Sequence, residues 1–473
     1  MNQHIKLTLS NQARPAVINK EHTEAEALFY QGNHCMQSGD SAGAEAYYRQ
    51  ALQIAPDFAE ASANLGLMLD RRGDSAGAET CYRRAIQINP AYSETHLNLG
   101  ALLANLKRFN EAELAYGQAI ALKPDSPVGW SNLGALYACM KRDSEAEQCC
   151  RKAILLDETY APARFNLGYL LLRQGRFDEG WRCLEARNWS SALAARLSCP
   201  RWQGESLAGK SLLIGHEAGH GDMIHFCRYA AVLKSQGAAS ITLICHPPLK
   251  DLFMSLEGVD ALVSSDDQIP ASGCDFWTPM LSIPYYCKTR LDSIPARIPY
   301  LHVPANRIEK WKGFLPASGL RVGLVWKGSP QFENDANRSL PSLGTLAPLW
   351  SVAGARFVSL QKGAGEAEAI QPVGGLPLVN LGPLVADFAD TAAVVANLDL
   401  VICVDTAIAH LAGALGKPCW VMLPAYKADW RWLTSRNDTP WYPRTMRLFR
   451  QTTAGDWAAV VAELVADLKQ LAT

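Results

Sequence analysis

The first third of the chain repeats itself every 34 residues, and this period constrains the fold more than any other feature of the 473 residues. The tripeptide Asn-Leu-Gly recurs at this interval, with its asparagines at Asn64, Asn98, Asn132 and Asn166. Glycine and alanine columns keep the same spacing, at Gly32, Gly66, Gly100, Gly134 and Gly168 and at Ala44, Ala78, Ala112 and Ala146. A unit of this length cannot bury its own apolar face, so neighbouring units must stack.

Each unit is predicted to form two short amphipathic helices. The small residues let the helices approach closely, and a tyrosine column at Tyr48, Tyr82 and Tyr116 fills the space between them. The pattern resembles the tetratricopeptide repeat in its length and in four columns. We expect four regular units over residues 25–160. A fifth unit begins at Ala161 and then departs from the pattern, which indicates a cap or a junction.

The asparagine column gives the solenoid a candidate peptide-binding surface. An asparagine side chain offers a donor and an acceptor together, so a row of them could pair with the backbone of any extended peptide. The row formed by Asn64, Asn98, Asn132 and Asn166 resembles the asparagine ladder of the eukaryotic O-linked N-acetylglucosamine transferase. Asparagine can equally bond one helix to the next in such repeats, so both interpretations stay open.

From about Ser211 the pattern changes to short apolar runs that are mostly separated by stretches of helical length. The runs lie at 211–215, 240–245, 259–263, 321–326, 356–360, 400–404 and 418–423. This alternation predicts parallel sheets with crossover helices. The expected organisation is a tail at 1–24, a solenoid at 25–195, α/β domains at 200–305 and 320–450, and a final helix at 455–473. Two such domains facing each other would form a cleft that suits a ligand.

The segment His216-Glu217-Ala218-Gly219-His220 fits the zinc-binding pattern H-E-x-x-H, but its context argues against zinc. That chemistry needs both histidines on one helix. Here an apolar strand precedes the segment and glycines oppose a helix. A strand, a glycine-rich turn and a helix opened by Gly221-Asp222 suit an anion better, although an aspartate at a helix start commonly acts only as a cap.

The run at 398–404 is followed by Asp405-Thr406-Ala407-Ile408-Ala409-His410, which predicts a buried strand, a tight turn and a helix. The backbone N–H groups of Thr406 and Ala407 would then lie at a helix start, where a nucleotide phosphate binds well. Thr406 adds a hydroxyl, and His410 lies one turn further along the same face. A capped, closely packed helix is the alternative.

Residues 399–423 resemble the donor-binding segment of bacterial glycosyltransferases of the ADP-heptose type, with Ala407 in place of the usual glycine. Gly221-Asp222 resembles the family's Gly-Asp, which implies that Asp222 is the catalytic base; His220 is the alternative. Residues 322–328 and 337–339 resemble the strand and the basic donor-phosphate contact of the second domain, which implies donor-binding roles for Lys327 and Arg338. The resemblance covers residues 210–450 and is strongest in the second domain.

The resemblance implies an α solenoid followed by an α/β GT-B fold with two Rossmann-like domains. It also implies transfer of a sugar from a nucleotide-sugar substrate to a protein acceptor that the repeats recruit, without a metal or a cofactor. No Asp-x-Asp occurs, which agrees with metal independence. The layout is similar to bacterial tetratricopeptide proteins that include flagellin glycosyltransferases, so flagellin is a candidate acceptor.

Composition limits the alternatives. Lys plus Arg total 45 and Asp plus Glu total 46, a net charge of −1 that argues against a nucleic-acid partner. No run of about 20 apolar residues is present, and the first residues lack the apolar core of a signal peptide. Thirteen cysteines without C-x-x-C predict reduced thiols in a cytoplasmic protein.

The sequence allows two alternative functions, and two further groups of residues are expected to have structural roles. A non-catalytic scaffold with a degenerate glycosyltransferase region is favoured only by Ala407, and a lipopolysaccharide-type glycan acceptor would leave the repeats without a purpose. Asp387 is expected to cap a helix rather than to contact a ribose. The aromatic residues at 430, 432, 441 and 442 are expected to form core or interface packing rather than a sugar-stacking surface.

Overall fold

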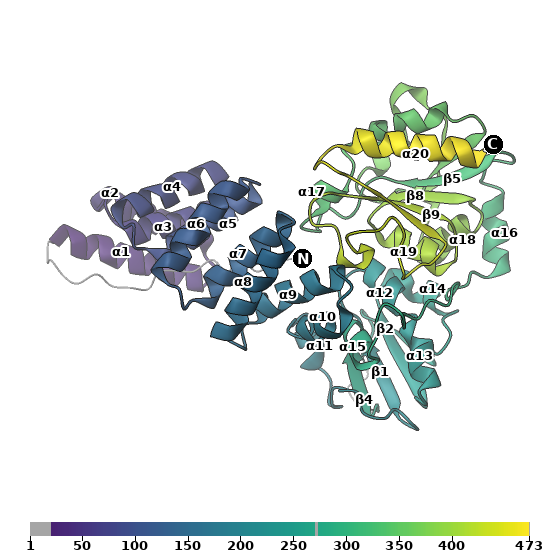
Figure 1. Ribbon diagram of the computed structural model, residues 1–473, viewed down its shortest axis with the longest axis horizontal. Coiled ribbons are helices and arrows are strands. Elements are labelled where there is room, and N and C mark those ends of the chain that lie inside the picture. Colours follow the sequence, from purple (N-terminus) through teal and green to yellow (C-terminus); the bar gives the residue numbers. More distant parts are fainter. Residues whose placement is uncertain (1–19, 270–272, 473) are drawn as a thin grey trace. The chain divides into compact units, whose positions relative to one another are not determined.

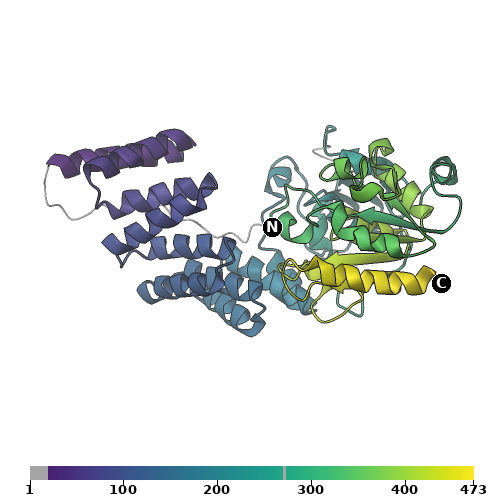
Figure 2. The ribbon, with the colours of Figure 1, turned by 90° about the horizontal axis from the view of Figure 1, so that it is seen from above.

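The computed structural model describes residues 20–269 and 273–472, and it divides into two compact units at Leu170 (Figure 1 and Figure 2). The first unit is built from helices alone, and the second contains two parallel sheets. Residues 1–19 of the expected tail lie outside the described residues. This architecture confirms the predicted fold class, an α solenoid followed by α/β domains.

The first unit is a stack of helix pairs that follow one another along the chain (Figure 2). Its helices are α1 (Lys20–Gln37), α2 (Ser41–Ile54), α3 (Ala59–Arg71), α4 (Ser75–Ile88), α5 (Ser93–Asn105), α6 (Phe109–Leu122), α7 (Pro127–Cys139), α8 (Asp143–Leu156) and the first part of α9 (Ala161–Arg173). The side chains of Asp40 and Asp74 accept the N–H groups of Gly43 and Gly77, which caps α2 and α4.

The glycine and tyrosine columns meet inside each helix pair. Tyr48, Tyr82 and Tyr116 are completely buried. A Cβ atom placed on Gly66 would lie 2.8 Å from the ring of Tyr82, and one on Gly100 would lie 2.7 Å from the ring of Tyr116. The glycines therefore leave the space that the next helix fills with an aromatic ring, as the period predicts.

The smaller sheet of the second unit has four parallel strands in the order β3-β2-β1-β4. Its strands are β1 (Ser211–Gly215), β2 (Ser240–Cys245), β3 (Ala261–Ser264) and β4 (Phe276–Pro279). The helices of this domain are α12 (His220–Phe226), α13 (Tyr229–Ser235), α14 (Lys250–Phe253) and α15 (Ile283–Tyr286). The chain turns from β1 directly into α12, so the glycine-rich segment lies at the carboxyl end of a central strand.

The larger sheet has six parallel strands in the order β10-β9-β8-β5-β6-β7. Its strands are β5 (Leu320–Val325), β6 (Ala355–Ser359), β7 (Leu378–Asn380), β8 (Leu400–Val404), β9 (Cys419–Leu423) and β10 (Met446–Arg450), and its helices are α16 (Ala305–Lys312), α17 (Asp335–Arg338), α18 (Phe388–Ala396), α19 (Ala407–Ala414) and α20 (Trp457–Ala472). The next two strands after β5 in the chain, β6 and β7, lie on one side of it, and those that follow β8, β9 and β10, lie on the other side. Ligands of open parallel sheets bind at the carboxyl ends of the two strands where the order reverses in this way, here β5 and β8.

Helices α10 (Phe177–Leu184) and α11 (Ser191–Ala194) belong to the α/β unit. The sequence placed residues 171–195 in the solenoid, and the difference has a clear physical cause. Trp181 of α10 is buried against Trp430, with ring centroids 5.2 Å apart, and Phe177 stacks on Trp441 at 5.9 Å. The departure from the repeat pattern at Trp181 thus marks a helix whose apolar face packs in the α/β unit.

One pair of cysteines differs from the reduced thiols that the sequence predicts. Cys199 and Cys274 form a disulfide, and the other eleven cysteines are free thiols. The two residues are 75 positions apart, but Arg201 forms a parallel bridge with Trp277 of β4, which brings the two segments together. A pairing that depends on this bridge leaves no signal in the local sequence.

Candidate active site

The turn between β8 and α19 has the geometry that the sequence predicts. β8 is buried along its whole length, and α19 begins at Ala407 with an extended Thr406 as its N-cap. The Thr406 side chain makes no capping bond, and its buried hydroxyl has no partner among the described residues. The first N–H groups of a helix lack intrahelical acceptors, so the turn offers several donors to an anion.

Ala407 fits this turn without backbone strain. It is the first residue of α19 and is not one of the described residues with a positive φ. A glycine is required only where φ is positive or a Cβ would collide. The replacement of the usual glycine therefore leaves the form of the turn intact.

Arg338 reaches this turn, whereas Lys327 is held by a carboxylate. The Nη1 atom of Arg338 donates to the backbone oxygen of Asp405 at 2.9 Å, and its Nε atom donates to Asp335 at 3.1 Å. Lys327 follows β5, and its Nζ atom lies 3.1 Å from Glu368. Arg338 is therefore a cation that lies beside the β8–α19 turn, and no hydrogen bond or ion pair among the described residues joins Lys327 to it.

Asp405 and His410 have shifted pKa values at this turn. Burial raises the pKa of Asp405 to about 6, and the carboxylate of Asp429 adds to the shift. Burial, Arg431 and Arg228 hold the pKa of His410 well below its usual value. The sequence places His410 one turn along the same face as Thr406, and its imidazole is neutral near pH 7. Its Nδ1 atom is hydrogen bonded to the Tyr442 hydroxyl at 3.0 Å.

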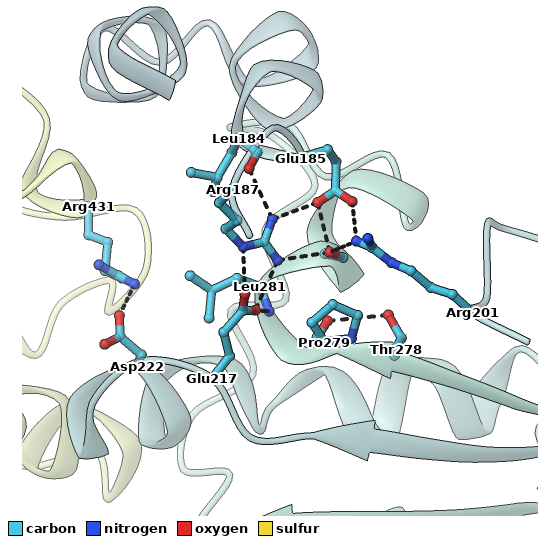
Figure 3. A network of polar contacts seen from close by, with 11 residues as sticks. Leu184, Glu185, Arg187, Arg201, Glu217, Asp222, Thr278, Pro279, Leu281 and Arg431 are labelled. Carbon is cyan, nitrogen blue, oxygen red and sulfur yellow. Dashed lines mark hydrogen bonds and ion pairs between the residues drawn. The ribbon is translucent and has the colours of Figure 1, made fainter. Parts of the chain in front are cut away.

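The structure of the segment at the start of α12 does not suit the H-E-x-x-H zinc pattern, and Asp222 caps this helix. The helix begins at His220, so His216 lies in the preceding turn and the two histidines do not share a helix. Asp222 accepts the N–H group of Gly219 at 2.9 Å, as a capping residue does. The same carboxylate, through its other oxygen, forms an ion pair with Arg431 (Figure 3). Asp222 is therefore both a cap and one half of an ion pair.

His220 lies beside two other rings. Its ring centroid is 5.0 Å from that of His246 and 5.2 Å from that of Phe388 at the start of α18. Burial and the neighbouring His246 lower the pKa of His220. A neutral imidazole can accept a proton, so the geometry leaves His220 available as the alternative base.

The starts of α12 and α19 meet closely. A Cβ atom on Gly221 would lie 3.0 Å from the His410 ring and 3.3 Å from the Cα atom of Ala407. A side chain at this position would require the His410 ring or the Ala407 backbone to shift by a few tenths of an ångström. The start of α12, which carries Asp222, and the turn before α19, which carries Thr406, therefore lie side by side although they are far apart in the sequence.

Arg431 is a residue of this region that the sequence did not single out. It lies in a short 3₁₀ turn, Trp430–Trp432, with 4% of its side chain exposed. Its Nη1 atom donates to both carboxylate oxygens of Asp429, at 2.9 and 3.0 Å, and its Nη2 atom pairs with Asp222. The sequence signal that could have identified it is a cation between two tryptophans, in a run that directly follows an aspartate.

The aromatic residues and Asp387 have the packing and capping roles expected of them. The side chains of Trp430, Trp432, Trp441 and Tyr442 are all buried to 99% or more. Asp387 accepts the N–H group of Asp390 at 2.7 Å and is the N-cap of α18.

The asparagine column is divided between two behaviours. Asn64 donates to Asn33 at 2.9 Å and Asn166 donates to Ser131 at 3.3 Å, which are the bonds between helices that the alternative interpretation requires. The Oδ1 atoms of Asn98 and Asn166 and the Nδ2 atom of Asn132 are buried and have no partner within the part of the chain that the structure describes. These three asparagines thus keep unused hydrogen-bonding capacity, and Asn98 and Asn132 are the middle two of the column.

Comparison with known families gives two matches. Residues 23–147 match the middle tetratricopeptide-like domain of cilia and flagella-associated protein 70. Residues 356–422, which run from β6 to β9 and include the β8–α19 turn, match glycosyltransferase family 9, the heptosyltransferases. None of the described helices is long and apolar enough to cross a membrane.

Individual proteins resemble parts of the chain. Protein FlbA of Caulobacter vibrioides is 29% identical over 330 residues, which cover 64% of this chain and 54% of FlbA. The match therefore spans about half the length of that relative. PilF of Pseudomonas aeruginosa is 22% identical over 38% of this chain and 84% of its own, with a TM-score of 0.34. TTC0263 of Thermus thermophilus is 21% identical over 36% of this chain and 96% of its own, with a TM-score of 0.32.

The family matches fall on the two parts of the chain that the repeat period and the strand–turn–helix motif had separated. The chain therefore combines a tetratricopeptide-like solenoid with an α/β unit in which residues 356–422 match glycosyltransferase family 9, the heptosyltransferases.

Proposed function

We propose that this protein transfers a sugar from a nucleotide-sugar donor to a protein acceptor that the solenoid recruits. The observation that carries the proposal is the meeting of α12 and α19 at Gly221, which places a carboxylate beside a helix start with free donors. Such transfer needs a base for the acceptor proton and a positive environment for the departing phosphate. Both features occur here within one part of the second unit.

The departing phosphate would bind at the β8–α19 turn. The N–H groups at the start of α19, the Thr406 hydroxyl and the guanidinium of Arg338 supply donors and positive charge. Asp222 would accept the acceptor proton, and His220 is the alternative. These protein groups supply the charge that the step requires, so the proposed reaction uses no metal or cofactor. The proposed location is the cytoplasm, which the eleven free thiols favour and the Cys199–Cys274 disulfide does not.

Isothermal titration of the full chain with a panel of nucleotide sugars tests the donor half of the proposal. Binding of one nucleotide sugar is the expected result, and binding of none would favour a non-catalytic scaffold. Intact-mass analysis of candidate acceptors, flagellin among them, tests the other half. A mass increase on a protein supports a protein acceptor, whereas an increase only on an oligosaccharide would identify a glycan acceptor.

Thr406→Val should weaken binding of the donor found in that panel by about 5- to 10-fold. Valine keeps the shape of threonine but removes the hydroxyl, and one hydrogen bond contributes about 1 kcal/mol. The measurement is the dissociation constant from the same titration. The matched control is Thr453→Val, at an exposed threonine of the second unit, which should leave the constant unchanged. Equal affinities for all three proteins would remove Thr406 from the donor site.

The double change of Asn98→Ala and Asn132→Ala should weaken acceptor binding by about 30-fold. Each asparagine has unused hydrogen-bonding capacity, and two lost bonds correspond to about 2 kcal/mol. The measurement is fluorescence polarisation of labelled peptides cut from the acceptor that intact-mass analysis identifies. Peptides of scrambled sequence should show the same loss, since the pairing is with the backbone.

Asn110→Ala, at an exposed asparagine of α6, is the control for this double variant. It should bind peptides as the unchanged protein does. Unaltered binding by the double variant, with a normal circular dichroism spectrum, would assign the asparagines to bonds between helices alone.

A further inference from the structure

The Arg431 guanidinium is fixed by more hydrogen bonds on one side than on the other. On the more strongly bonded side, Asp429 accepts two bonds from Nη1 and a third from the Arg431 backbone N–H at 2.9 Å. The rings of Trp430 and Phe226 lie 4.5 and 5.2 Å from the guanidinium carbon. On the other side, Nη2 faces Asp222, whose side chain is 24% exposed (Figure 3).

This arginine lies beside the β8–α19 turn. The next residue, Trp432, stacks on the ring of His410 with centroids 5.3 Å apart and planes 11° apart. Arg431 also acts electrostatically on Asp405 and on His410. The guanidinium is therefore close to the start of α19, where the proposed donor phosphate would bind.

Charge explains why the pairing with Asp222 is exchangeable. The carboxylates of Asp222, Asp405 and Asp429 share this region with the guanidiniums of Arg338 and Arg431. A donor phosphate brings further negative charge, and a planar guanidinium binds phosphate as readily as carboxylate. Asp222 accepts one contact from the guanidinium, whereas Asp429 accepts two from Nη1 and a third from the Arg431 backbone. Asp222 is therefore the partner that a phosphate oxygen can replace with the smaller loss of hydrogen bonds.

We propose that Arg431 is a donor-phosphate ligand that Asp222 occupies in the free protein, and that the incoming phosphate takes the Nη2 donor and releases the Asp222 carboxylate. This inference rests on the proposed function, since it assigns a further residue to the same donor site. It also gives the exchange a purpose. A carboxylate paired with a guanidinium is a weak base, and Asp222 would become available for the acceptor proton only once the donor is bound.

A static clamp between the two α/β domains is the competing explanation, and the two accounts differ in what Asp222→Asn does. If Asp222 competes with phosphate for Arg431, removal of its charge should tighten phosphate binding. If the pair is only a clamp, removal should leave the affinity unchanged or weaken it. The experiment is isothermal titration of the full chain with UDP, GDP, ADP and inorganic pyrophosphate.

In a double-mutant cycle, the two single substitutions are expected to change the affinity for a diphosphate in opposite directions. Asp222→Asn should bind the preferred diphosphate about 3- to 10-fold more tightly than the unchanged protein, and Arg431→Gln about tenfold or more weakly. The double variant should bind as Arg431→Gln does, because the gain requires the arginine. Arg431→Lys should retain part of the affinity, since it keeps the charge but not the planar fork.

Arg436→Gln is the matched control, because Arg436 pairs with Asp438 on the exposed surface of the same segment. It should bind diphosphates normally. Unchanged binding by Arg431→Gln, or unchanged or weaker binding by Asp222→Asn, would overturn the inference while leaving the donor site in place. Failure of the unchanged protein to bind any of the four probes would instead overturn the proposed function together with it.

Discussion

Asp222→Asn is expected to abolish sugar transfer while the donor still binds. Asparagine keeps the size of the side chain and can still accept the Gly219 N–H group, so the cap of α12 survives. It cannot take a proton from the acceptor. Loss of a general base lowers turnover by about 10²- to 10⁴-fold. The measurement is the rate of mass increase on the acceptor under saturating donor, with donor affinity from titration.

His220→Gln, at the alternative base, separates the two candidates. If Asp222 is the base, His220→Gln should retain most of the turnover. A nearly normal rate for Asp222→Asn with a large loss for His220→Gln would transfer the role to His220. A thermal melt of each variant shows whether either change acts through the fold instead.

Glu217→Gln is expected to destabilise the second unit by about 3–5 kcal/mol. Glu217 is buried and receives two bonds from Arg187, at 2.8 and 2.9 Å, beside the turn that leads to Asp222 (Figure 3). Only 2% of the Arg187 side chain is exposed. Removal of the Glu217 charge leaves the cluster of Arg187, Glu185 and Arg201 with one positive charge in excess, and breaking a buried pair in this way costs about 3–5 kcal/mol. The measurement is the free energy of unfolding from urea denaturation.

An exposed ion pair of the same unit gives the control. Asp178 and Arg290 are 2.9 Å apart with more than half of each side chain exposed. Asp178→Asn should change the free energy of unfolding by less than about 1 kcal/mol. The double change Arg187→Met and Glu217→Leu should recover much of the loss, because it removes both charges. Equal, small effects at both pairs would show that the buried pair contributes no more than a surface one.

Much of the fold could be predicted because the relevant signals are local. The strands β1, β2 and β8 have the predicted ends, since each is a continuous apolar run between turn residues. The expected apolar runs do not include β4, β7 or β10. β4 and β7 have only four and three residues, and β10, Met446–Arg450, carries two arginines in five residues. Its position beside β9 at the edge of the sheet allows those charged ends to stay in contact with solvent.

The candidate site could be predicted only where one motif holds it. The β8–α19 turn is a continuous stretch, and its donors at Thr406 and Ala407 follow from the strand–turn–helix order. Arg431 and Asp222 are separated by 209 positions, and the pairing of Arg187 with Glu217 spans 30. The first contact joins the two α/β domains, and the second joins the segment after α10 to the end of β1. Both depend on tertiary packing, and no local pattern in the sequence records them.

The assignment of α10 to the α/β unit has a consequence for how such a chain can evolve. Whole 34-residue units can be gained or lost before α9 without removing Trp181 or Arg187 from the core of the second unit. Repeat copy number and the structure of the second unit are then independent characters. A lineage could lengthen or shorten its solenoid in uniform steps while the second unit stays the same.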